Sequence, residues 1–246
     1  MAERPAQSYG AQIADRYDSL YGPPPEAMLA RLAAWVGPGE RALELGIGTG
    51  RIALPLQARG VAVHGIDQSP EMVAKLRAKP GGERIPVTMG DFASPGALPG
   101  APFQLVFCVF STLFGLTTQE QQVRCFREVA ALLAPGGSFV LEAFLPDPAR
   151  FSPRQPVFVR SVEAAGLTLE GGEHDAPRQM VHSRIVALQP DCVAVLALEM
   201  RYAWPSELDL MADLAGLRRV ERWADWDGRQ PANGDAMQVS VYRKPR

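Results

Sequence analysis

Short apolar runs recur along the first 145 residues, and helical stripes separate them. The runs predict five strands, at 41–46, 61–67, 85–91, 103–110 and 138–145. Apolar residues at helical spacing predict helices over 26–36 and 51–60, and two more after Ser69 and Thr118. The run 103–110 is apolar almost throughout, which is typical of a strand buried on both faces. Alternating strands and helices predict an α/β fold, with a parallel sheet covered by helices on both faces.

Local signals mark the ends of several helices. Ser69 precedes a proline, and Thr118 has a glutamine three residues later, which is the spacing of a capping box. The segment "APGG" at 134–137 is expected to end the fourth of these helices, before the fifth strand. Ser206 is expected to cap a later helix over 206–216.

The pattern of apolar residues changes at about residue 146, where a cluster of prolines begins. Strand-like runs follow without helical stripes between them, at 157–162, 167–173, 179–188 and 193–204. One face of the last run carries Leu196, Leu198, Met200, Tyr202 and Trp204. These runs predict an antiparallel addition of about 55 residues. Two further strands are expected beyond the helix, over 217–226 and 236–244.

Composition narrows the classes of function. The chain has 246 residues, 47% of them hydrophobic, which suffices for one α/β domain with an elaboration. Its net charge is −2 and its basic clusters are short, so we expect neither nucleic acid nor a membrane as partner. Three widely spaced cysteines favour a reducing compartment and argue against a metal site. Because no secretory signal or bilayer-spanning apolar run is present, we expect a cytoplasmic location.

The stretch "LELGIGTGRI" at 43–52 indicates a ligand site. Gly46, Gly48 and Gly50 fall between the first strand and the next helix. At such a turn glycines let a ligand approach the backbone, and the helix N-terminus supplies positive potential. Dinucleotide sites need G-x-G-x-x-G, whereas here the third glycine comes one residue early.

Acidic residues near three strand ends describe the ligand. Glu44 precedes the glycines, and a carboxylate there would repel a pyrophosphate but suits an ammonium group. Asp67 lies 21 residues after Gly46 at the end of the second strand, where a carboxylate binds a ribose diol. Asp91 closes the third strand as an acceptor for an exocyclic amine, and Phe92 adds an apolar ring. Ribose, adenine and an amino-acid end without phosphate describe S-adenosylmethionine.

With these motifs the sequence resembles the class I S-adenosylmethionine-dependent methyltransferases. The resemblance rests on four segments in order, "LELGIGTG", "GIDQSPEMV", "MGDF" and "LLAPGGSFVLEAF". It implies a Rossmann-like doubly wound sheet, mostly parallel with an antiparallel last strand, plus an inserted antiparallel β subdomain. The expected parts are an N-terminal lid segment over 1–25, a cofactor-binding core over 26–148 and 205–246, and the insertion over 149–204.

The resemblance also implies which residues hold S-adenosylmethionine. They are Tyr17, Tyr21, Glu44, Gly46, Gly48, Gly50, Arg51, Asp67, Gln68, Met72, Asp91, Phe92 and Val109. Tyr17 and Tyr21 are candidates to bind the methionine end or to tolerate positive charge during transfer. No residue is assigned a catalytic role.

A narrower likeness is to small-molecule N-methyltransferases, above all the enzymes that dimethylate amino sugars. It rests on "YDSLYG" at 17–22, on "VFSTLFGL" at 109–116 and on the all-β addition. Some of those enzymes carry a histidine where this chain has Gly115, so their base does not carry over. His174 and His182 lie in the addition that could roof the site, and either is a candidate base for a phenol or enol.

The expected function is in-line methyl transfer from S-adenosylmethionine to an amine or hydroxyl of a small molecule of natural-product type. N-methylation of a peptide or protein terminus is the alternative, and a nicotinamide-dependent oxidoreductase is a more distant one. Exposed strand edges in the addition would allow two chains to pair as a homodimer.

Overall fold

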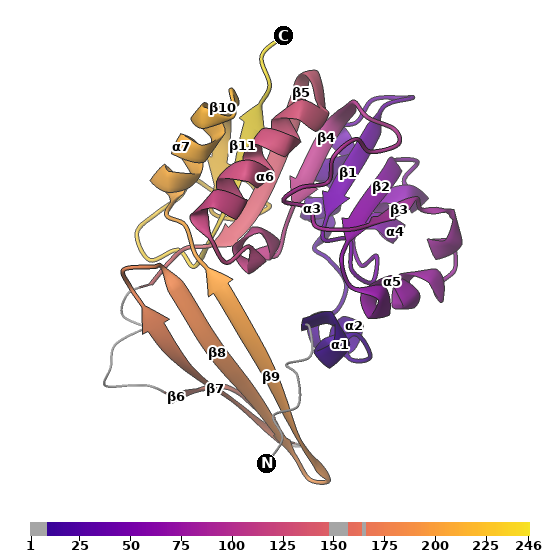
Figure 1. The fold of residues 1–246 in the computed structure, drawn as a ribbon. Coiled ribbons are helices and arrows are strands. Elements are labelled where there is room, and N and C mark those ends of the chain that lie inside the picture. The colour runs from indigo at the N-terminus through magenta and orange to yellow at the C-terminus, as the bar shows by residue number, and fades with distance from the viewer. Residues whose placement is uncertain (1–8, 148–156, 164–165) are drawn as a thin grey trace.

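The computed structural model describes residues 9–147, 157–163 and 166–246. These residues form two separate sheets (Figure 1). The larger has seven strands in the order β10-β11-β5-β4-β1-β2-β3, and the smaller has four in the order β6-β7-β8-β9. In the larger sheet β1 to β5 are parallel, whereas β11 is antiparallel to both β5 and β10. The predicted fold class, a mostly parallel sheet plus an antiparallel one, is confirmed.

The larger sheet forms the core of the molecule. Its strands are β1 (Arg41–Leu45), β2 (Ala62–Asp67), β3 (Val87–Met89), β4 (Phe103–Cys108), β5 (Leu133–Phe144), β10 (Arg218–Trp223) and β11 (Met237–Arg243). From β4, Val106 and Cys108 enter one apolar cluster, and Leu105 and Phe107 enter another. Strand β4 is therefore buried on both faces, as its continuous apolar run predicts.

Helices cover both faces of this sheet. They are α3 (Glu26–Ala34), α4 (Ala53–Ala58), α5 (Pro70–Arg77), α6 (Gln119–Leu132) and α7 (Pro205–Leu214), with the 3-10 turns η1 (Gly82–Arg84) and η2 (Thr112–Gly115). Phe126 of α6 and Met211 of α7 pack in one apolar cluster, whereas Leu32 of α3 and Leu56 of α4 pack in the other. The doubly covered arrangement agrees with the alternation of strands and helices along the chain.

Helix starts follow the local signals in two cases out of three. The Ser69 hydroxyl accepts an N–H of the first turn of α5, and Thr118 begins α6 with a reciprocal capping box. The prediction for Ser206 is wrong, because α7 begins at Pro205 with Trp204 as its N-cap. Proline has its φ already fixed near the helical value, so the helix starts one residue earlier than the serine indicates.

Helix α6 ends before residues 134–137, as expected, but these residues already belong to β5, which begins earlier than the strand predicted from 138. Gly136 donates to the carbonyl of Lys244 at 3.0 Å, and Lys244 donates to the carbonyl of Gly137 at 2.9 Å. These bonds extend the pairing of β5 beyond β11. A partner 108 positions away thus converts a turn-like sequence into strand.

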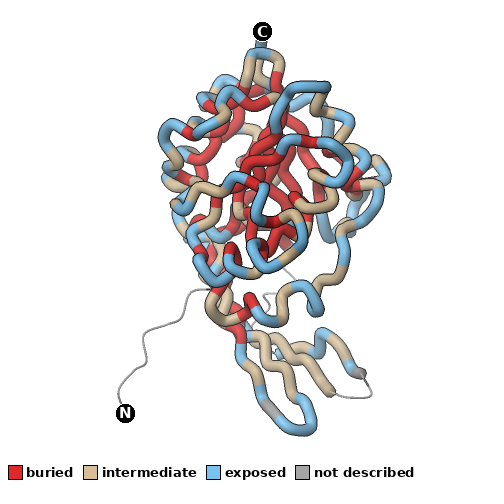
Figure 2. The backbone as a smooth tube through the Cα atoms, turned by 90° about the vertical axis from the view of Figure 1, so that its right-hand side faces the viewer, coloured by how far each residue is buried: buried red, intermediate tan, exposed pale blue. Residues whose placement is uncertain are grey.

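The smaller sheet consists of β6 (Val157–Glu163), β7 (Gly166–Asp175), β8 (Met180–Gln189) and β9 (Cys192–Arg201). Its inner face packs through Leu196 and Leu198 on Ile13. Its outer face exposes valines that are 54% to 77% accessible, namely Val157, Val159, Val162, Val193 and Val195. Figure 2 shows the buried backbone concentrated in the larger sheet, with little of it in this addition. The expected pairing of two chains stays a prediction.

Two short helices, α1 (Tyr9–Ile13) and α2 (Tyr17–Tyr21), lie at the edge of the core that faces the smaller sheet (Figure 1). Helix α1 contacts α5 on one side and β9 on the other. Gly10 approaches Ser69 so closely that a Cβ at this position would overlap the serine hydroxyl. The N-terminal helices are therefore packed against the carboxyl ends of the core strands.

Candidate active site

The turn after β1 brings backbone into close contact with two other elements. Gly46, Gly48 and Gly50 have φ of +73°, +55° and +73°, a conformation that side chains rarely adopt. A Cβ on Gly46 would lie 2.5 Å from Cγ2 of Thr112, and one on Gly48 would lie 3.1 Å from Cε of Met72. Glycine is thus required both by the backbone conformation and by the space between β1, η2 and α5.

Glu44 is a buried acid near the carboxyl end of β1, with 3% of its surface exposed. Burial raises the pKa of this carboxyl group well above its usual range, although the charge of Arg51 and an N–H of Ala53 oppose the shift. Its Oε2 atom has no hydrogen-bond partner among the described residues. A buried hydrogen-bond acceptor without a donor costs free energy, so a ligand that brings a hydrogen-bond donor to Oε2 would be stabilised here.

Asp67 ends β2 directly beside the glycine turn. Its Oδ2 accepts the N–H of Gly48 at 2.7 Å, and its Oδ1 accepts that of Ser69 at 2.8 Å. Burial raises the pKa of Asp67, while these bonds and an N–H of Gln68 lower it. Gln68 itself is exposed at the rim. The structure thus brings the second predicted carboxylate to the same edge as Glu44.

The third strand supplies the residues expected around an adenine. Gly90 donates to the carbonyl of Asp67 at 2.9 Å, which ties this loop to the end of β2. Asp91 is exposed, and its Oδ1 accepts the N–H of Ala93 at 2.8 Å. Phe92 is half-buried against the core. Val109, also expected at the site, is buried just beyond β4.

Aromatic side chains cover the carboxyl ends of β1 and β4. The ring of Tyr21 lies 4.9 Å from that of Tyr17 and 4.7 Å from that of Phe110, measured between centroids. The guanidinium of Arg51 stacks on Phe110 at 5.1 Å and hydrogen-bonds to Tyr17. Burial raises the pKa of Tyr17 to about 12 despite this arginine, so its phenol is neutral at physiological pH.

Sequence reasoning missed how Phe110 is held. Phe110 and Ser111 both have a φ of +59°, which is unusual for residues with side chains. Glu142, buried in β5, accepts the Phe110 N–H at 2.7 Å and the Trp226 Nε1–H at 2.9 Å. The signal was present, because Glu142 is the one acidic residue in the apolar run 138–145.

The two candidate bases lie on opposite faces of the smaller sheet. His182 pairs across strands with Glu199, and its Nδ1 lies 3.6 Å from a carboxylate oxygen of that residue on the outer face. His174 pairs with Val181 on the inner face, and its Nε2 lies 3.0 Å from the hydroxyl of Tyr202. The structure does not bring His182 to the side of the sheet that faces α1.

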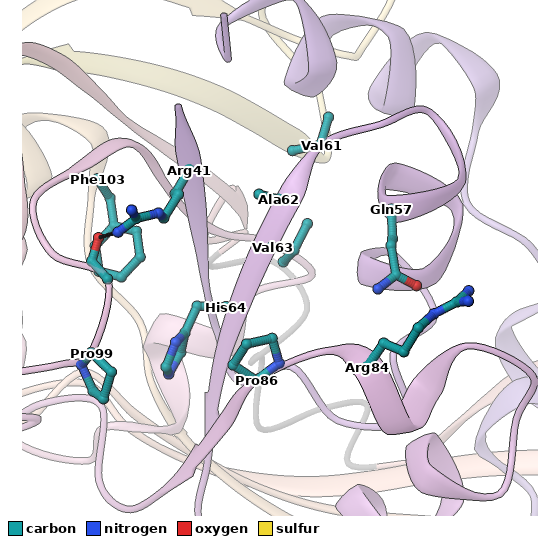
Figure 3. A pocket seen from close by; sticks show the side chains of 11 residues that line it. Arg41, Gln57, Val61, Ala62, Val63, His64, Arg84, Pro86, Pro99 and Phe103 are labelled. Carbon is teal, nitrogen blue, oxygen red and sulfur yellow. Dashed lines mark hydrogen bonds between the residues drawn. The ribbon is translucent and has the colours of Figure 1, made fainter. Parts of the chain in front are cut away.

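A hollow of about 420 Å³ lies at the opposite edge of the core sheet (Figure 3). The starts of β1, β2 and β4 line it. Arg41 donates to the carbonyl of Gly100 at 2.9 Å, and His64 is 2.9 Å from the hydroxyl of Thr88. Burial lowers the pKa of His64. His64 is thus a buried histidine of β2 with a hydrogen-bond partner on β3.

In the part of the chain that the structure describes, no helix is long and apolar enough to cross a membrane. Within those same residues, no group of three or more histidine, cysteine or acidic side chains is placed to hold a metal ion.

Comparison with known proteins identifies the region that contains the glycine turn. A family profile described as a methyltransferase domain matches residues 42–137. This segment runs from β1 into the first residues of β5. It therefore includes Glu44, Asp67 and Asp91.

Two relatives are similar to this chain over most of its length. The structure of the CcbJ methyltransferase from Streptomyces caelestis is 37% identical, with a TM-score of 0.86 over 98% of this chain and 99% of that chain. The cypemycin N-terminal methyltransferase from a Streptomyces species is 31% identical over 200 residues, which are 76% of this chain and 78% of that protein.

CalS10, an amino pentose methyltransferase from Micromonospora echinaspora, shares the fold. Its S-adenosylmethionine-bound structure superposes with a TM-score of 0.66 over 99% of both chains. The sequence identity is 22%, so this likeness concerns the architecture alone.

Proposed function

Because the chain belongs to the S-adenosylmethionine-dependent methyltransferases, we propose that it methylates an amine of a small molecule enclosed between its core and its N-terminal helices. A hydroxyl group of such a small molecule is the second candidate acceptor. The single observation that carries the proposal is the unpartnered Oε2 of Glu44 beside the glycine turn.

The donor set at this edge suits S-adenosylmethionine. The ammonium group of the cofactor would supply the hydrogen-bond donor that Glu44 lacks among the described residues. Asp67 would hold the ribose hydroxyls, and Asp91 with Phe92 would hold the adenine. Gly46 and Gly48 let the backbone of the turn approach the cofactor. Of the other expected ligands, Tyr17, Tyr21, Arg51, Gln68, Met72 and Val109 lie around the same edge.

The protein contributes mainly position and shielding to the reaction. The cofactor supplies an activated methyl group on a positively charged sulfur. Holding an acceptor in line with that group is worth on the order of 7–11 kcal/mol of the barrier. The aromatic faces of Tyr17, Tyr21 and Phe110 can each stabilise a nearby positive charge by about 0.5–2 kcal/mol. The cover formed by α1 and α2 excludes water from the reacting groups.

The chemistry of the site favours an amine over a hydroxyl. A neutral amine attacks without a strong base, whereas a phenol needs a base with a pKa near neutrality. The neutral phenol of Tyr17 cannot remove a proton at that pH, since its pKa is raised to about 12. Of the two candidate bases, His182 lies on the outer face of the smaller sheet, and His174 on the inner face is held by the Tyr202 hydroxyl at 3.0 Å. The name of the cypemycin enzyme, which concerns an N-terminus, supports the same choice.

The proposal is tested with labelled S-adenosylmethionine and a panel of acceptors. The panel contains amino sugars, amino-acid amides, short peptides with a free N-terminus, and matched hydroxyl compounds. We expect label on nitrogen of a small acceptor, located by mass spectrometry. Methylation of short peptides alone would favour the terminal-amine alternative. The absence of any thermal shift or heat with millimolar cofactor would overturn the assignment of the site.

A further inference from the structure

Two ion pairs connect the N-terminal helices to α5 and the residues that follow it. Asp15 contacts Lys75 at 2.6 Å, and Asp18 contacts Lys79 at 2.6 Å. The pairs differ in exposure. The Asp15 side chain is 86% exposed and that of Lys75 is 44%, against 45% for Asp18 and 30% for Lys79. Exposed pairs stabilise little, so the Asp15 pair is expected to be weak.

The Asp18 pair has a third member inside the glycine turn. The Thr49 hydroxyl donates to Oδ1 of Asp18 at 2.7 Å, and Lys79 Nζ donates to the Thr49 carbonyl at 2.7 Å. Thr49 is fully buried between Gly48 and Gly50. Asp18, Thr49 and Lys79 therefore form a closed triangle that joins α2, the turn and the end of α5. We call it the Asp18 junction.

Helix α2 depends on such contacts. It has five residues, none of them buried, and its N-cap makes no side-chain hydrogen bond. A helix of this length is not stable by itself in water. The burial of Asp18 would raise its pKa, but hydrogen bonds from Lys79 and Thr49 lower it overall, so the carboxylate stays charged at neutral pH. The neighbouring Tyr17 and Tyr21 depend on the position of α2.

We propose that Asp18 is a positioning residue, which docks α2 onto the glycine turn and thereby retains the bound cofactor beneath Tyr17 and Tyr21. The proposal rests on the proposed function, because it concerns the same cofactor site. Asp18 acts through Thr49 and does not itself touch the reacting groups. Opening of the junction is the event that releases S-adenosylhomocysteine after transfer.

The test compares Asp18→Asn with Asp15→Asn, a matched change on the same segment. S-adenosylhomocysteine is bound to each full-length protein, and its dissociation rate is measured by stopped-flow. We expect Asp18→Asn to raise the dissociation rate and the KM for S-adenosylmethionine at least tenfold, with a smaller change in kcat at saturation. Asp15→Asn should remain within twofold of the parent. Asp18→Glu, which keeps the charge, should restore part of the retention.

A second variant removes the same contact from the other side. Thr49→Val deletes the hydroxyl donor at nearly constant volume, and its effect should not add to that of Asp18→Asn, since both break one junction. If Asp18→Asn releases S-adenosylhomocysteine as slowly as Asp15→Asn, the junction has no such role. If the parent protein binds no S-adenosylhomocysteine by calorimetry, the failure lies in the proposed function instead.

Discussion

The carboxyl group of Glu44 lies where ionisation is unfavourable. Burial raises its pKa well above the usual glutamate range. At pH values between the ordinary glutamate pKa and the raised pKa of Glu44, the folded protein keeps a proton that the unfolded chain has lost. The free energy of unfolding of the ligand-free protein should therefore fall as pH rises from the ordinary glutamate range through the raised pKa of Glu44.

This shift predicts that cofactor binding releases a proton. An ammonium group beside Glu44 favours the charged carboxylate, which opposes the effect of burial. Calorimetry at several values between roughly pH 5 and 8, in buffers of different ionisation enthalpy, measures the protons exchanged. The parent should release a proton on binding S-adenosylmethionine over part of this range, whereas Glu44→Gln should not. Identical proton exchange in the two proteins would contradict a role for Glu44 at the ammonium group.

Asp67 provides a second prediction for single residues. Hydrogen bonds to a charged carboxylate are worth roughly 1.5–3 kcal/mol. Asp67→Ala should therefore weaken S-adenosylmethionine binding at least tenfold, measured by calorimetry, with circular dichroism unchanged. Asp213→Ala serves as control, because it removes an exposed carboxylate paired with Arg218 on the other side of the sheet. An unchanged dissociation constant for Asp67→Ala would mean that the ribose hydroxyls are bound by other residues.

Residues differ in how far sequence alone predicts their place. Glu44 and Asp67 are predictable because both belong to strands that are read from local apolar runs. Asp18 and Glu142 are not, because their partners Thr49 and Trp226 lie 31 and 84 positions away. No local pattern encodes such pairings, and the acid in each segment is the one visible sign of them.

At the scale of elements, a polar junction joins the smaller sheet to α6 and α7. Arg201, at the end of β9, contacts Glu207 of α7 at 2.7 Å and donates to Gln122 of α6 at 2.7 Å. Gln179, just before β8, donates to Glu207 at 2.7 Å. The burial of Glu207 would raise its pKa, but hydrogen bonds from Gln179 and Arg201 lower it overall. These contacts hold the end of the smaller sheet against α6 and α7.

Breaking this junction should destabilise the protein more than breaking a surface pair. Arg201→Met leaves Glu207 as a mostly buried charge without its cation, which costs about 3 kcal/mol. Arg218→Met removes an exposed pair with Asp213 and should cost less than about 1 kcal/mol. Urea denaturation of both variants measures the difference. Equal losses in the two would mean that the junction adds nothing beyond a surface ion pair.

Some sequence signals for elements hold because they depend on adjacent residues, whereas others are overridden by neighbouring or distant residues. Ser69 and Thr118 cap their helices as predicted, because a cap depends on three or four consecutive residues. Ser206 fails because the adjacent Pro205 begins α7. The fifth strand begins earlier than the predicted residue 138, because residues 136 and 137 pair with a segment remote in sequence. Elements are thus predictable where short-range bonds decide, and their boundaries shift where the sheet supplies partners.

At the scale of the whole molecule, α1 lies between α5 of the core and β9 of the smaller sheet and contacts both. Ile13 and Ala14 pack with Met72 of α5 and Leu196 of β9 in one small apolar cluster. Removing residues 1–22 should therefore abolish turnover while the core sheet, with its own two clusters, still unfolds cooperatively. Methylation assays and thermal unfolding of the truncated chain test this. Full activity without residues 1–22 would contradict the enclosed site.

Strand order also affects how the chain folds. Strand β11 pairs along β5 from Ser138 to Phe144, yet the whole smaller sheet and α7 come between them in the sequence. Until residues 237–243 have been synthesised, β5 presents an unpaired edge that carries Phe139, Val140 and Leu141. Such an edge is a template for pairing with other chains. Closing it requires a contact of long sequence separation, which makes this step slow relative to local pairing. The nascent chain is thus most prone to aggregate in the interval between the emergence of β5 and that of β11.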